Sequence, residues 1–412
     1  MTSRERVLAS IDHKEPDKVP VDLGAHPSSG ISAMAYNNLK KHLGYDHPTK
    51  VYDVVQQLAE PDDSIIEHFG VDVLDVGRVF NTDPSKWYDI KLADGSTAQY
   101  PIWFKPVNEE DGSWSAYDDD GDLLARMPDK AAFFDQTLFP FLDSYPADYK
   151  KLPEAMDKVL WGKFATSPWD HANEENFYET LREKTLKLRE NSDKALMIGA
   201  GCNLFEWGTF LRRLDNFLMD VLVDPVNVEK LLDALVEIHL NSLEKICNAV
   251  GDAADIVKFG DDLGMTKGMF MPAEIYQSLF KPRHKIMCDY VKKNSNMKIC
   301  LHSCGSIEPI IPDLIEAGFE ILNPVQTNCK DMDPVKLKNK FGSEVTFWGG
   351  GADTTNILNK STPEEIRKHV LERLEIFSKG GGFVFNQVHN ILPEVPPENI
   401  VAMFDTVKEF NS

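Results

Sequence analysis

Short apolar segments recur along the chain, separated by longer stretches in which apolar residues follow a helical period. Eight of these segments are rich in β-branched and apolar residues: 18–24, 71–77, 195–201, 254–262, 297–305, 319–326, 345–351 and 382–389. Continuous apolar runs of this length are typical of strands that are buried on both faces, as in a parallel sheet. The pattern therefore predicts eight buried parallel strands.

Amphipathic helices are predicted between most of these strands. In residues 361–382, Thr362 and Glu365 form a capping box and glycines end the helix. Its apolar face is formed by Ile366, Val370, Leu374 and Phe377. Thr2 and Glu5 form another capping box, which predicts a helix from about residue 3 to 13.

Two further helical segments, 204–225 and 272–294, show the same pattern, and Pro282 should kink or split the second. Eight strands alternating with helices predict an α/β fold, namely a (β/α)8 TIM barrel. The rival is an open doubly wound sheet. The rival is disfavoured because no G-x-G-x-x-G follows the first strand and the chain has no P-loop.

Residues about 85–165 interrupt the alternation after the second strand. Here Asp-Gly pairs at 94–95 and 120–121 separate runs of alternating apolar and polar residues, which is a strong hairpin signal. We expect one barrel domain, residues 1–412, with a β-rich insertion at 85–165. The insertion is either a lid or a loop that merely covers the barrel.

The composition is that of a globular protein, with 42% hydrophobic and 27% charged residues. The formal net charge of −22 disfavours nucleic acid and anionic membrane surfaces as partners. No signal peptide or transmembrane run is found, and the six cysteines lack a disulfide-scaffold spacing. A reduced, cytoplasmic protein is therefore expected, and a homo-oligomer is left open.

Active sites of such barrels lie at the C-terminal ends of the strands, and here those ends carry polar residues. The fifth strand ends in His302 and Cys304, whose i, i+2 spacing puts both side chains on one face. Imidazole nitrogen and thiolate sulfur are zinc ligands, but a site needs three or four. The pair is therefore either part of a metal site or an ordinary structural pair.

Other strand ends supply the remaining candidates. Asp261 and Asp262 follow the fourth strand, where they could bind substrate, donate a ligand or cap the next helix. Glu206 lies in the first turn of a helix, which stabilises a carboxylate in any case. His389 follows the eighth strand and is either a ligand or a hydrogen-bonded structural histidine.

Several segments resemble the uroporphyrinogen decarboxylase superfamily. These are "RERVLASIDHKEPDKVPVDLG", "VKFGDDLGMTKGMFMPAEIYQSLFKPRHKIM", "LHSCGSIEPIIPDLIEAGFEILNPVQ", "FWGGGADTTNILNKSTPEEIR" and "GGFVFNQVHNILPEVPPENI". The resemblance covers nearly the whole chain apart from the insertion. It implies a (β/α)8 barrel and one of two chemistries: cofactor-free decarboxylation of uroporphyrinogen, or zinc-dependent methyl transfer involving corrinoid proteins or thiols.

The motifs favour the methyltransferase branch. Decarboxylases of the superfamily carry an R-x-A-G-R pattern that grips substrate carboxylates, whereas this chain reads "VDLGAHPSSG" at the corresponding position, with no arginine. The H-x-C of the methyltransferases is matched by His302 and Cys304. Their usual third ligand, a cysteine near the last strand, is absent from "FNQVHN" (385–390), so His389, Asp261, Asp262 or Glu206 would replace it.

The resemblance thus implies a zinc-dependent methyltransferase that moves a methyl group from a small methoxy or methylamine donor to a corrinoid protein or a thiol. The alternative is a cofactor-free decarboxylase of a carboxylated substrate, and a third class is a non-catalytic binding protein. The expected metal ligands are His302, Cys304 and His389. The expected catalytic residues are Asp261, Asp262 and Glu206, and the expected substrate-binding residues are His26, Asn323, Gln326, Asn386 and Trp207.

Overall fold

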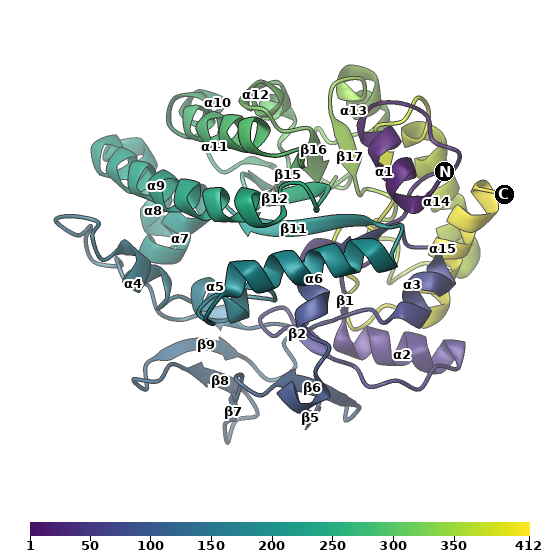
Figure 1. Cartoon of the computed structure of the whole chain (residues 1–412), viewed down its shortest axis with the longest axis horizontal. Helices are drawn as coiled ribbons and strands as arrows, with labels where there is room; N and C mark the ends of the chain where they lie inside the picture. The colour runs from purple at the N-terminus through teal and green to yellow at the C-terminus, as the bar shows by residue number, and fades with distance from the viewer.

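A sheet of seven parallel strands forms the centre of the protein in a computed structural model that describes residues 1–412 (Figure 1). The strands, in spatial order, are β18 (Phe383–Val384), β17 (Thr346–Trp348), β16 (Ile321–Asn323), β15 (Lys298–His302), β12 (Ile256–Gly260), β11 (Ala195–Gly201) and β4 (Val73–Asp75). Every neighbouring pair is parallel. Seven of the eight predicted strands are therefore confirmed.

The remaining predicted strand, the first in the chain at 18–24, is reduced to a single parallel bridge between Val21 and Phe385. This segment is hydrogen-bonded on both sides, because Asp22 N–H donates to the Phe385 carbonyl and Asp72 N–H donates to the Val21 carbonyl, each at 2.8 Å. Pro20 has no N–H to donate, which keeps the ladder short. The segment lies between the two edge strands, β18 and β4, and closes the curled sheet. The predicted TIM-type barrel is confirmed, with one strand shorter than expected.

Helices surround the sheet, and α1 packs against the apolar layer at one end of the barrel. They include α1 (Ser3–Ile11), α3 (Asp63–Phe69), α6 (Phe177–Asn191), α7 (Phe205–Arg212), α8 (Leu214–Val223), α9 (Pro225–Val250), α11 (Lys281–Asn294), α12 (Ile311–Ala317), α13 (Pro334–Phe341), α14 (Pro363–Phe377) and α15 (Pro397–Phe410). Both predicted capping boxes are present, at Thr2 and at Thr362. No helix combines the length and the apolar character needed to cross a membrane.

The segment around Pro282 is split as predicted. A short helical turn, α10 (Ala273–Ile275), leads into a π-helical turn at Tyr276–Phe280, and α11 begins at Lys281 with Pro282 in its first turn. A proline lacks the N–H and crowds the carbonyl four residues earlier, so a wider turn before it avoids that conflict. The segment 204–225 is likewise split, because Arg213 has a φ of 69° between α7 and α8.

Between β4 and β11 lie the antiparallel strands β5 (Trp87–Lys91), β6 (Thr97–Pro101), β7 (Val107–Asn108), β8 (Trp114–Tyr117), β9 (Leu123–Met127) and β10 (Asp135–Gln136). The Asp-Gly pairs at 94–95 and 120–121 join β5 to β6 and β8 to β9. These strands are followed by the short helices α4 (Leu152–Met156) and α5 (Leu160–Lys163). In Figure 1 the strands lie below the barrel, on the side away from α11 and α12. That the segment works as a lid stays a prediction.

Residues 27–62 form a second addition that the sequence pattern did not reveal. It contains a 3-10 turn (Pro27–Ser29), β1 (Ile31–Ser32), α2 (Ala33–Leu43), β2 (Val51–Asp53) and β3 (Leu58–Ala59), and the three strands make a small antiparallel sheet. The later insertion is attached to it, because Gln99 N–H donates to the Thr49 carbonyl at 2.7 Å and Phe134 N–H donates to the Val55 carbonyl at 2.9 Å.

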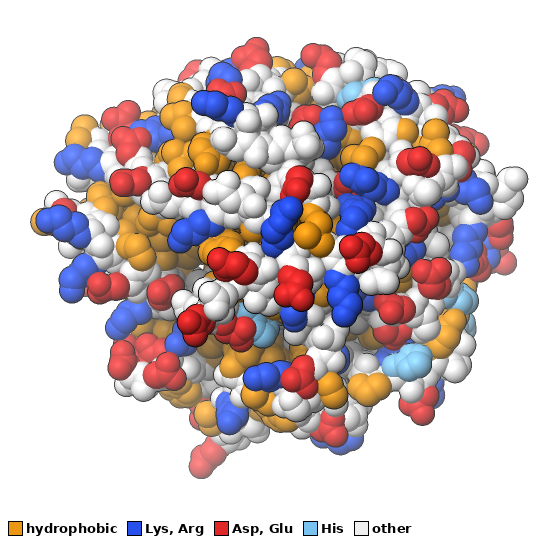
Figure 2. All heavy atoms as spheres, in the orientation of Figure 1, with side chains coloured by type: hydrophobic (Ala, Val, Ile, Leu, Met, Phe, Trp, Pro, Cys, Tyr) orange, Lys and Arg blue, Asp and Glu red, His pale blue; other side chains and the backbone are white.

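An apolar layer fills the N-terminal end of the barrel interior. It consists of inward side chains from neighbouring strands and α1, including Val73, Met197, Ile256, Cys300, Ile321, Trp348 and Val384. Polar inward residues follow this layer toward the C-terminal ends of the strands. On the outer face drawn in Figure 2, acidic and basic side chains are interspersed with hydrophobic ones, so the net negative charge is not gathered there in one acidic patch.

Candidate functional site

Three side chains with metal-ligating atoms meet at the C-terminal ends of the strands. His302 ends β15, Cys304 follows two residues later, and His389 lies in the loop after β18. One ligand atom from each residue lies within 4.8 Å of the other two, and Cys304 Sγ is 3.4 Å from His302 Nε2. The sequence placed these three residues together as metal ligands, and the fold brings them together. We call them the His-Cys-His cluster.

A glycine holds the turn that carries Cys304. Gly305 has a φ of 87°, and a Cβ at this position would lie 2.2 Å from the Gly264 carbonyl carbon in β13 (Gly264–Met265). A side chain is therefore excluded both by the left-handed backbone and by the close approach. Gly305 N–H donates to Gln326 Oε1. Gln326, predicted to bind substrate, thus supports the same turn.

Hydrogen bonds fix which nitrogen of His302 is free. Asn323 Nδ2 donates to the Trp348 carbonyl at 2.9 Å, which orients the amide so that Oδ1 faces His302 Nδ1, also at 2.9 Å. Because Oδ1 can only accept, Nδ1 carries the proton and Nε2 keeps its lone pair toward Cys304. Asn323 was predicted to contact substrate, but its amide is fully used in orienting the histidine.

The chain of hydrogen bonds continues to the first barrel segment. Ser28 Oγ donates to Asn323 Oδ1 at 2.7 Å and lies 2.8 Å from His26 Nδ1, which donates to it. His26 and Ser28 are both buried. We call His26, Ser28 and Asn323 the relay to His302. His26 lies in the segment that corresponds to the arginine-containing pattern of the decarboxylases. In this protein its side chain supports a ligand of the cluster.

His389 is oriented in a similar way. Its Nδ1 lies 3.0 Å from Asn390 Oδ1, and Asn390 Nδ2 donates to Gln56 Oε1 at 3.3 Å, which assigns the Asn390 oxygen as the acceptor. Nδ1 therefore carries the proton, and Nε2 is left with a lone pair. Burial lowers the pKa of His302 well below its usual value and also lowers the pKa of His389, so both rings are neutral near pH 7. Neutral imidazole is the form that binds metals.

Without a cation, the cluster sulfur is a thiol. Burial raises the pKa of Cys304 well above its usual value, and the carboxylates of Asp262 and Glu206 raise the pKa further. A bound divalent cation reverses this preference, because a coordinated thiol loses its proton. Two neutral imidazoles and one thiol with free ligand atoms fit a zinc ion, which takes nitrogen and sulfur ligands.

Two carboxyl groups lie beside the cluster. Asp262 Oδ1 accepts from Cys304 N–H at 2.8 Å and lies 3.5 Å from His302 Nε2. Glu206, in the first turn of α7, accepts from Asn203 Nδ2 at 2.5 Å. Burial raises the pKa of Glu206 well above its usual value, and Asp262 and Asp261 raise it further. Burial also raises the pKa of Asp262. Glu206 is therefore protonated more readily than an exposed glutamate.

Asp261 differs from its neighbour, and the catalytic role predicted for it is not supported by its contacts. Its side chain is fully buried and accepts from Phe205 N–H at 3.0 Å and from Glu206 N–H at 2.9 Å. His284 Nε2 lies 3.2 Å from the same carboxylate. Asp261 therefore caps α7 instead of facing the His-Cys-His cluster, because the first N–H groups of a helix have no partner within the helix.

The last two predicted substrate residues differ in their surroundings. Asn386 is fully buried, and neither its amide oxygen nor its amide nitrogen has a hydrogen-bonding partner in the protein. Trp207 lies on α7, where its ring packs edge-on against Phe210 with 5.7 Å between centroids. Trp161, from the short helix α5, also stacks on Phe210, at 5.8 Å. Trp207 and Trp161 thus share one neighbour, Phe210.

A cavity of about 240 Å³ opens beside the cluster. Its wall comes from three parts of the chain. The barrel strands supply Asp75, Gly199, Gly201 and Lys258. The 27–62 addition supplies Pro27, Tyr52, Asp53 and Gln56, and residues 161–169 supply Trp161, Phe164 and Trp169. The three cluster residues do not line it, but its wall includes His26, which belongs to the relay, and Gln56, which is bonded to Asn390. The charge of Lys258 also contributes to the low pKa of His302, after burial.

Sequence reasoning missed Tyr52, Asp53 and Lys258. Lys258 interrupts the apolar strand "IVKFG", and a charged residue at an inward position of a buried strand is the one signal that could have revealed it. Tyr52 and Asp53 lie on a strand of three residues, which is too short for a two-residue period to be recognised. We call this space the lysine cavity.

Asp75, in the wall of the lysine cavity, should make the stability of the folded protein depend on pH. Burial raises the pKa of Asp75 to about 7, which means that its ionised form destabilises the folded state. This destabilisation is absent below about pH 4, the pKa of an aspartate in the unfolded chain, and grows as the pH rises toward 7. Asp75→Asn is therefore expected to be more stable than the wild type at pH 8, by on the order of 2–4 kcal/mol, and equally stable near pH 4.

Urea unfolding at pH 4, 6 and 8 checks this expectation for Asp75. Glu110→Gln, at an exposed carboxyl group in a loop, is the matched control and should follow the wild type at every pH. A difference between Asp75→Asn and the wild type that does not change with pH would contradict the raised pKa.

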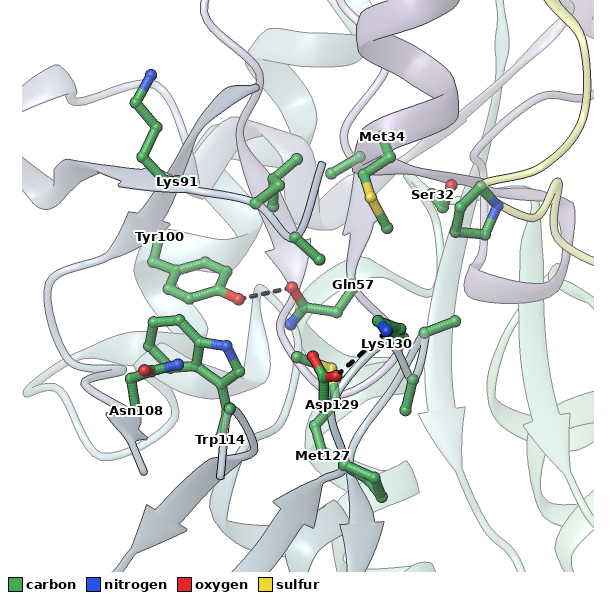
Figure 3. A pocket seen from close by; sticks show the side chains of 18 residues that line it. Ser32, Met34, Gln57, Lys91, Tyr100, Asn108, Trp114, Met127, Asp129 and Lys130 are labelled. Atoms are coloured by element: carbon green, nitrogen blue, oxygen red, sulfur yellow. Dashed lines mark hydrogen bonds and ion pairs between the residues drawn. The ribbon is translucent and has the colours of Figure 1, made fainter. Parts of the chain in front are cut away.

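A second cavity, of about 380 Å³, lies between the start of α2 and the insertion strands (Figure 3). Met34, Leu92, Trp114 and Met127 give it an apolar wall, and Tyr100 Oη donates to Gln57 Oε1 at 2.5 Å across it. Gln57 lines this cavity, whereas Asp53 and Gln56 of the same turn line the lysine cavity. No cluster of metal-ligating side chains lies in its wall.

Comparisons with known proteins agree with this architecture. A family model described as uroporphyrinogen decarboxylase (URO-D) matches residues 176–410. Uroporphyrinogen decarboxylase from Pseudoalteromonas atlantica is 27% identical over 196 residues, which cover 46% of this chain and 50% of that protein. The enzyme from Methylococcus capsulatus is 43% identical over 98 residues, covering 24% and 26%. The chain thus spans half or less of the length of these curated relatives.

Among solved structures, a methyltransferase from Methanosarcina mazei matches with a TM-score of 0.61 and 18% identity, covering 100% of both chains. At this identity the likeness concerns the fold alone. The family match begins in α6 and includes every strand from β11 to β18, and with them the strand ends that carry His302, Cys304 and His389. The chain therefore belongs to the uroporphyrinogen decarboxylase family.

Proposed function

We propose that this protein is a zinc-dependent methyltransferase that moves a methyl group from a small methylated donor of the methoxy or methylamine type to a corrinoid protein or a thiol. The observation that carries the proposal is the His-Cys-His cluster. Its three residues come from different parts of the chain and offer two imidazole nitrogens and one sulfur within 4.8 Å of one another. A decarboxylase that works without a cofactor does not need two imidazoles and a thiol in this arrangement.

His302, Cys304 and His389 would hold the zinc ion. When bound, zinc supplies Lewis acidity toward the heteroatom of the donor and keeps a coordinated thiol ionised. The relay and Asn390 orient the two imidazoles before any metal arrives. Such outer hydrogen bonds fix the tautomer of ligating histidines and raise their affinity for metals.

The transfer breaks the bond between the methyl carbon and the donor heteroatom, and that electron pair stays on the heteroatom. A lone pair of the acceptor forms the new bond to the methyl carbon, and the heteroatom takes up a proton. Glu206 is the proposed source of this proton. Asn203 occupies its Oε2, so a proton on this carboxyl group resides on Oε1, and burial raises the pKa of Glu206 well above its usual value, which favours the protonated form.

The partner in this proposal is a corrinoid protein or a free thiol that delivers the acceptor to the barrel mouth. The alternative is decarboxylation, which the names of the curated relatives favour. Against it, the segment 21–30 contains no arginine, and its polar residues His26 and Ser28 are used in the relay. A polycarboxylate substrate would find no guanidinium there.

The test is made on the purified protein. Zinc content is measured by mass spectrometry, and methyl transfer from O-methyl and N-methyl donors to reduced cobalamin or to a thiol is followed by absorbance and by product analysis. Zinc at about one ion per chain together with methyl transfer supports the proposal. Carbon dioxide release from carboxylated substrates by the metal-free protein would replace it with the decarboxylase alternative.

Removing the Asn323 side chain should weaken the metal site without destroying it. In Asn323→Ala the proton of His302 Nδ1 loses its acceptor and the imidazole can rotate, so we expect the zinc affinity to fall about 10–100-fold. Competition with a chelating dye measures this affinity. Asn328→Ala, a half-buried asparagine outside the relay, should retain the wild-type value. Equal affinities in both variants would show that the relay does not orient His302.

A further inference from the structure

Lys258 is an unpaired cation inside the barrel. It lies on β12 between Ile256 and Gly260, with its side chain in the wall of the lysine cavity, and no hydrogen bond or ion pair joins its ammonium group to another protein group. It is also the one lysine or arginine among the lining residues. An ammonium group in such a place lacks the partner that buried charges normally have.

Tyr52 offers a second donor to the same space. Its side chain lines the lysine cavity, only 6% of the residue is exposed, and its buried hydroxyl has no hydrogen-bonding partner. Burial raises the pKa of the Tyr52 hydroxyl well above its usual value, so the group keeps its proton. A buried hydroxyl without a partner is costly unless a ligand or water satisfies it.

The carboxylates of the cavity do not neutralise Lys258 by direct pairing. Asp53 accepts from Val55 N–H at 3.0 Å and from both the backbone and the side-chain amide of Gln56 at 2.9 Å. Asp75 accepts from Gly77 N–H at 3.0 Å. Both carboxyl groups thus face donors on their own loops. The unpaired donors on Lys258 and Tyr52 therefore favour a ligand group that accepts hydrogen bonds and carries a negative charge.

Aromatic side chains also line the cavity. Trp161, Phe164 and Trp169 belong to the segment between the insertion strands and α6. Trp169 is held against the barrel, because its Nε1 donates to the Gly199 carbonyl at 2.7 Å. Flat apolar walls of this kind receive the flat, apolar part of a ligand, whereas the few polar groups fix its orientation.

We propose that the lysine cavity binds a small organic monocarboxylate, with its carboxylate group on Lys258 and Tyr52 and its apolar part against Trp161, Phe164 and Trp169. This inference rests on the proposed function, since it makes the methyl donor a carboxylate. In this proposal the methyl group at the far end of the donor points toward the His-Cys-His cluster, because the cavity wall includes His26 of the relay and Gln56, which is bonded to Asn390.

Binding is tested without metal or methyl acceptor. Titration calorimetry on the full-length protein in the presence of a chelator compares benzoate with benzamide, which has the same shape but no charge, and with N,N-dimethylglycine, which has the carboxylate but no ring. We expect benzoate to bind at least about tenfold more tightly than benzamide, because a charge-assisted hydrogen bond is lost in the amide. The comparison with N,N-dimethylglycine distinguishes an aromatic donor from an aliphatic one.

Two variants test the residues separately. Lys258→Met keeps the length of the side chain and should weaken benzoate binding about 10–100-fold while leaving benzamide unchanged, and Tyr52→Phe should weaken it about tenfold. Lys91→Met, at a lysine of the second cavity, is the matched control and should bind benzoate as the wild type does. Circular dichroism checks that each variant folds, and Lys258→Arg, which keeps the charge, should restore part of the affinity.

The proposal is overturned if benzoate and benzamide bind equally, if neither binds with a Kd below about 10 mM, or if Lys258→Met binds benzoate like the wild type. This outcome is separable from failure of the proposed function. Carboxylate binding without any methyl transfer would overturn only the methyltransferase proposal. Methyl transfer that is indifferent to a carboxylate on the donor would overturn only the present inference.

Discussion

Cys304→Ala is expected to lose bound zinc and to reduce methyl transfer by roughly a hundredfold or more, while the protein remains folded. The substitution removes the one sulfur of the His-Cys-His cluster, and two imidazoles alone do not make a zinc site. The loss should exceed the 10–100-fold effect of removing a residue that only orients a ligand. Cys304 is only partly buried and follows the strand instead of lying in the apolar layer, so little core packing is lost.

Zinc content and the rate of methyl transfer are measured on Cys304→Ala and on the wild type, prepared side by side. Cys329→Ala is the matched control, because Cys329 is also partly buried but lies outside the cluster, with its Sγ 3.9 Å from Gln326 Oε1. The control should keep both zinc and activity. Wild-type methyl transfer by a zinc-free Cys304→Ala protein would show that the cluster is structural.

Asp261→Ala is expected to lower the free energy of unfolding by about 3–5 kcal/mol, which is the usual cost of removing one partner of a buried charged network. The substitution leaves Phe205 N–H and Glu206 N–H at the start of α7 without an acceptor, and His284 loses the carboxylate that lies 3.2 Å from it. The side chain is fully buried, so water does not replace the lost contacts. Chemical denaturation with circular dichroism measures the change.

The neighbouring residue is the control for Asp261. Asp262→Asn keeps an acceptor for Cys304 N–H, so we expect it to change the unfolding free energy by less than about 1 kcal/mol, with its main effect on the reaction. If instead Asp261→Ala is as stable as the wild type but inactive, Asp261 is a catalytic residue and the helix-capping role is wrong.

The parts of the fold that the sequence predicts are those in which one physical signal is strong. Apolar runs located seven of the barrel strands, because a strand buried on both faces has no room for polar residues. Asp-Gly pairs located the two hairpins, because their turns need a left-handed backbone. The sheet β1-β3-β2 was not predicted because its strands are two or three residues long. The strand at 18–24 was predicted, but its reduction to a single bridge at Val21 was not.

The site was predictable to the extent that it follows from strand ends. His302, Cys304 and His389 lie together because parallel strands of a barrel end at the same rim. The difference between Asp261 and Asp262 was not predictable, since adjacent residues at a strand end point in opposite directions and only the position of α7 decides which one caps a helix. Tyr52 belongs to an addition that had no recognisable pattern, so only the fold shows that it lines the same cavity as Lys258.

The segment around Val21, which is paired in the barrel by a single bridge, leads directly into the residues that orient a proposed metal ligand. The residues that follow this segment, His26 and Ser28, hold Asn323 and through it His302. A segment tied to each neighbour by so few hydrogen bonds opens at a lower free energy than the strands around it. On warming, the metal ligand should therefore lose its alignment before the barrel melts, so that heat inactivation precedes unfolding and is reversed on cooling.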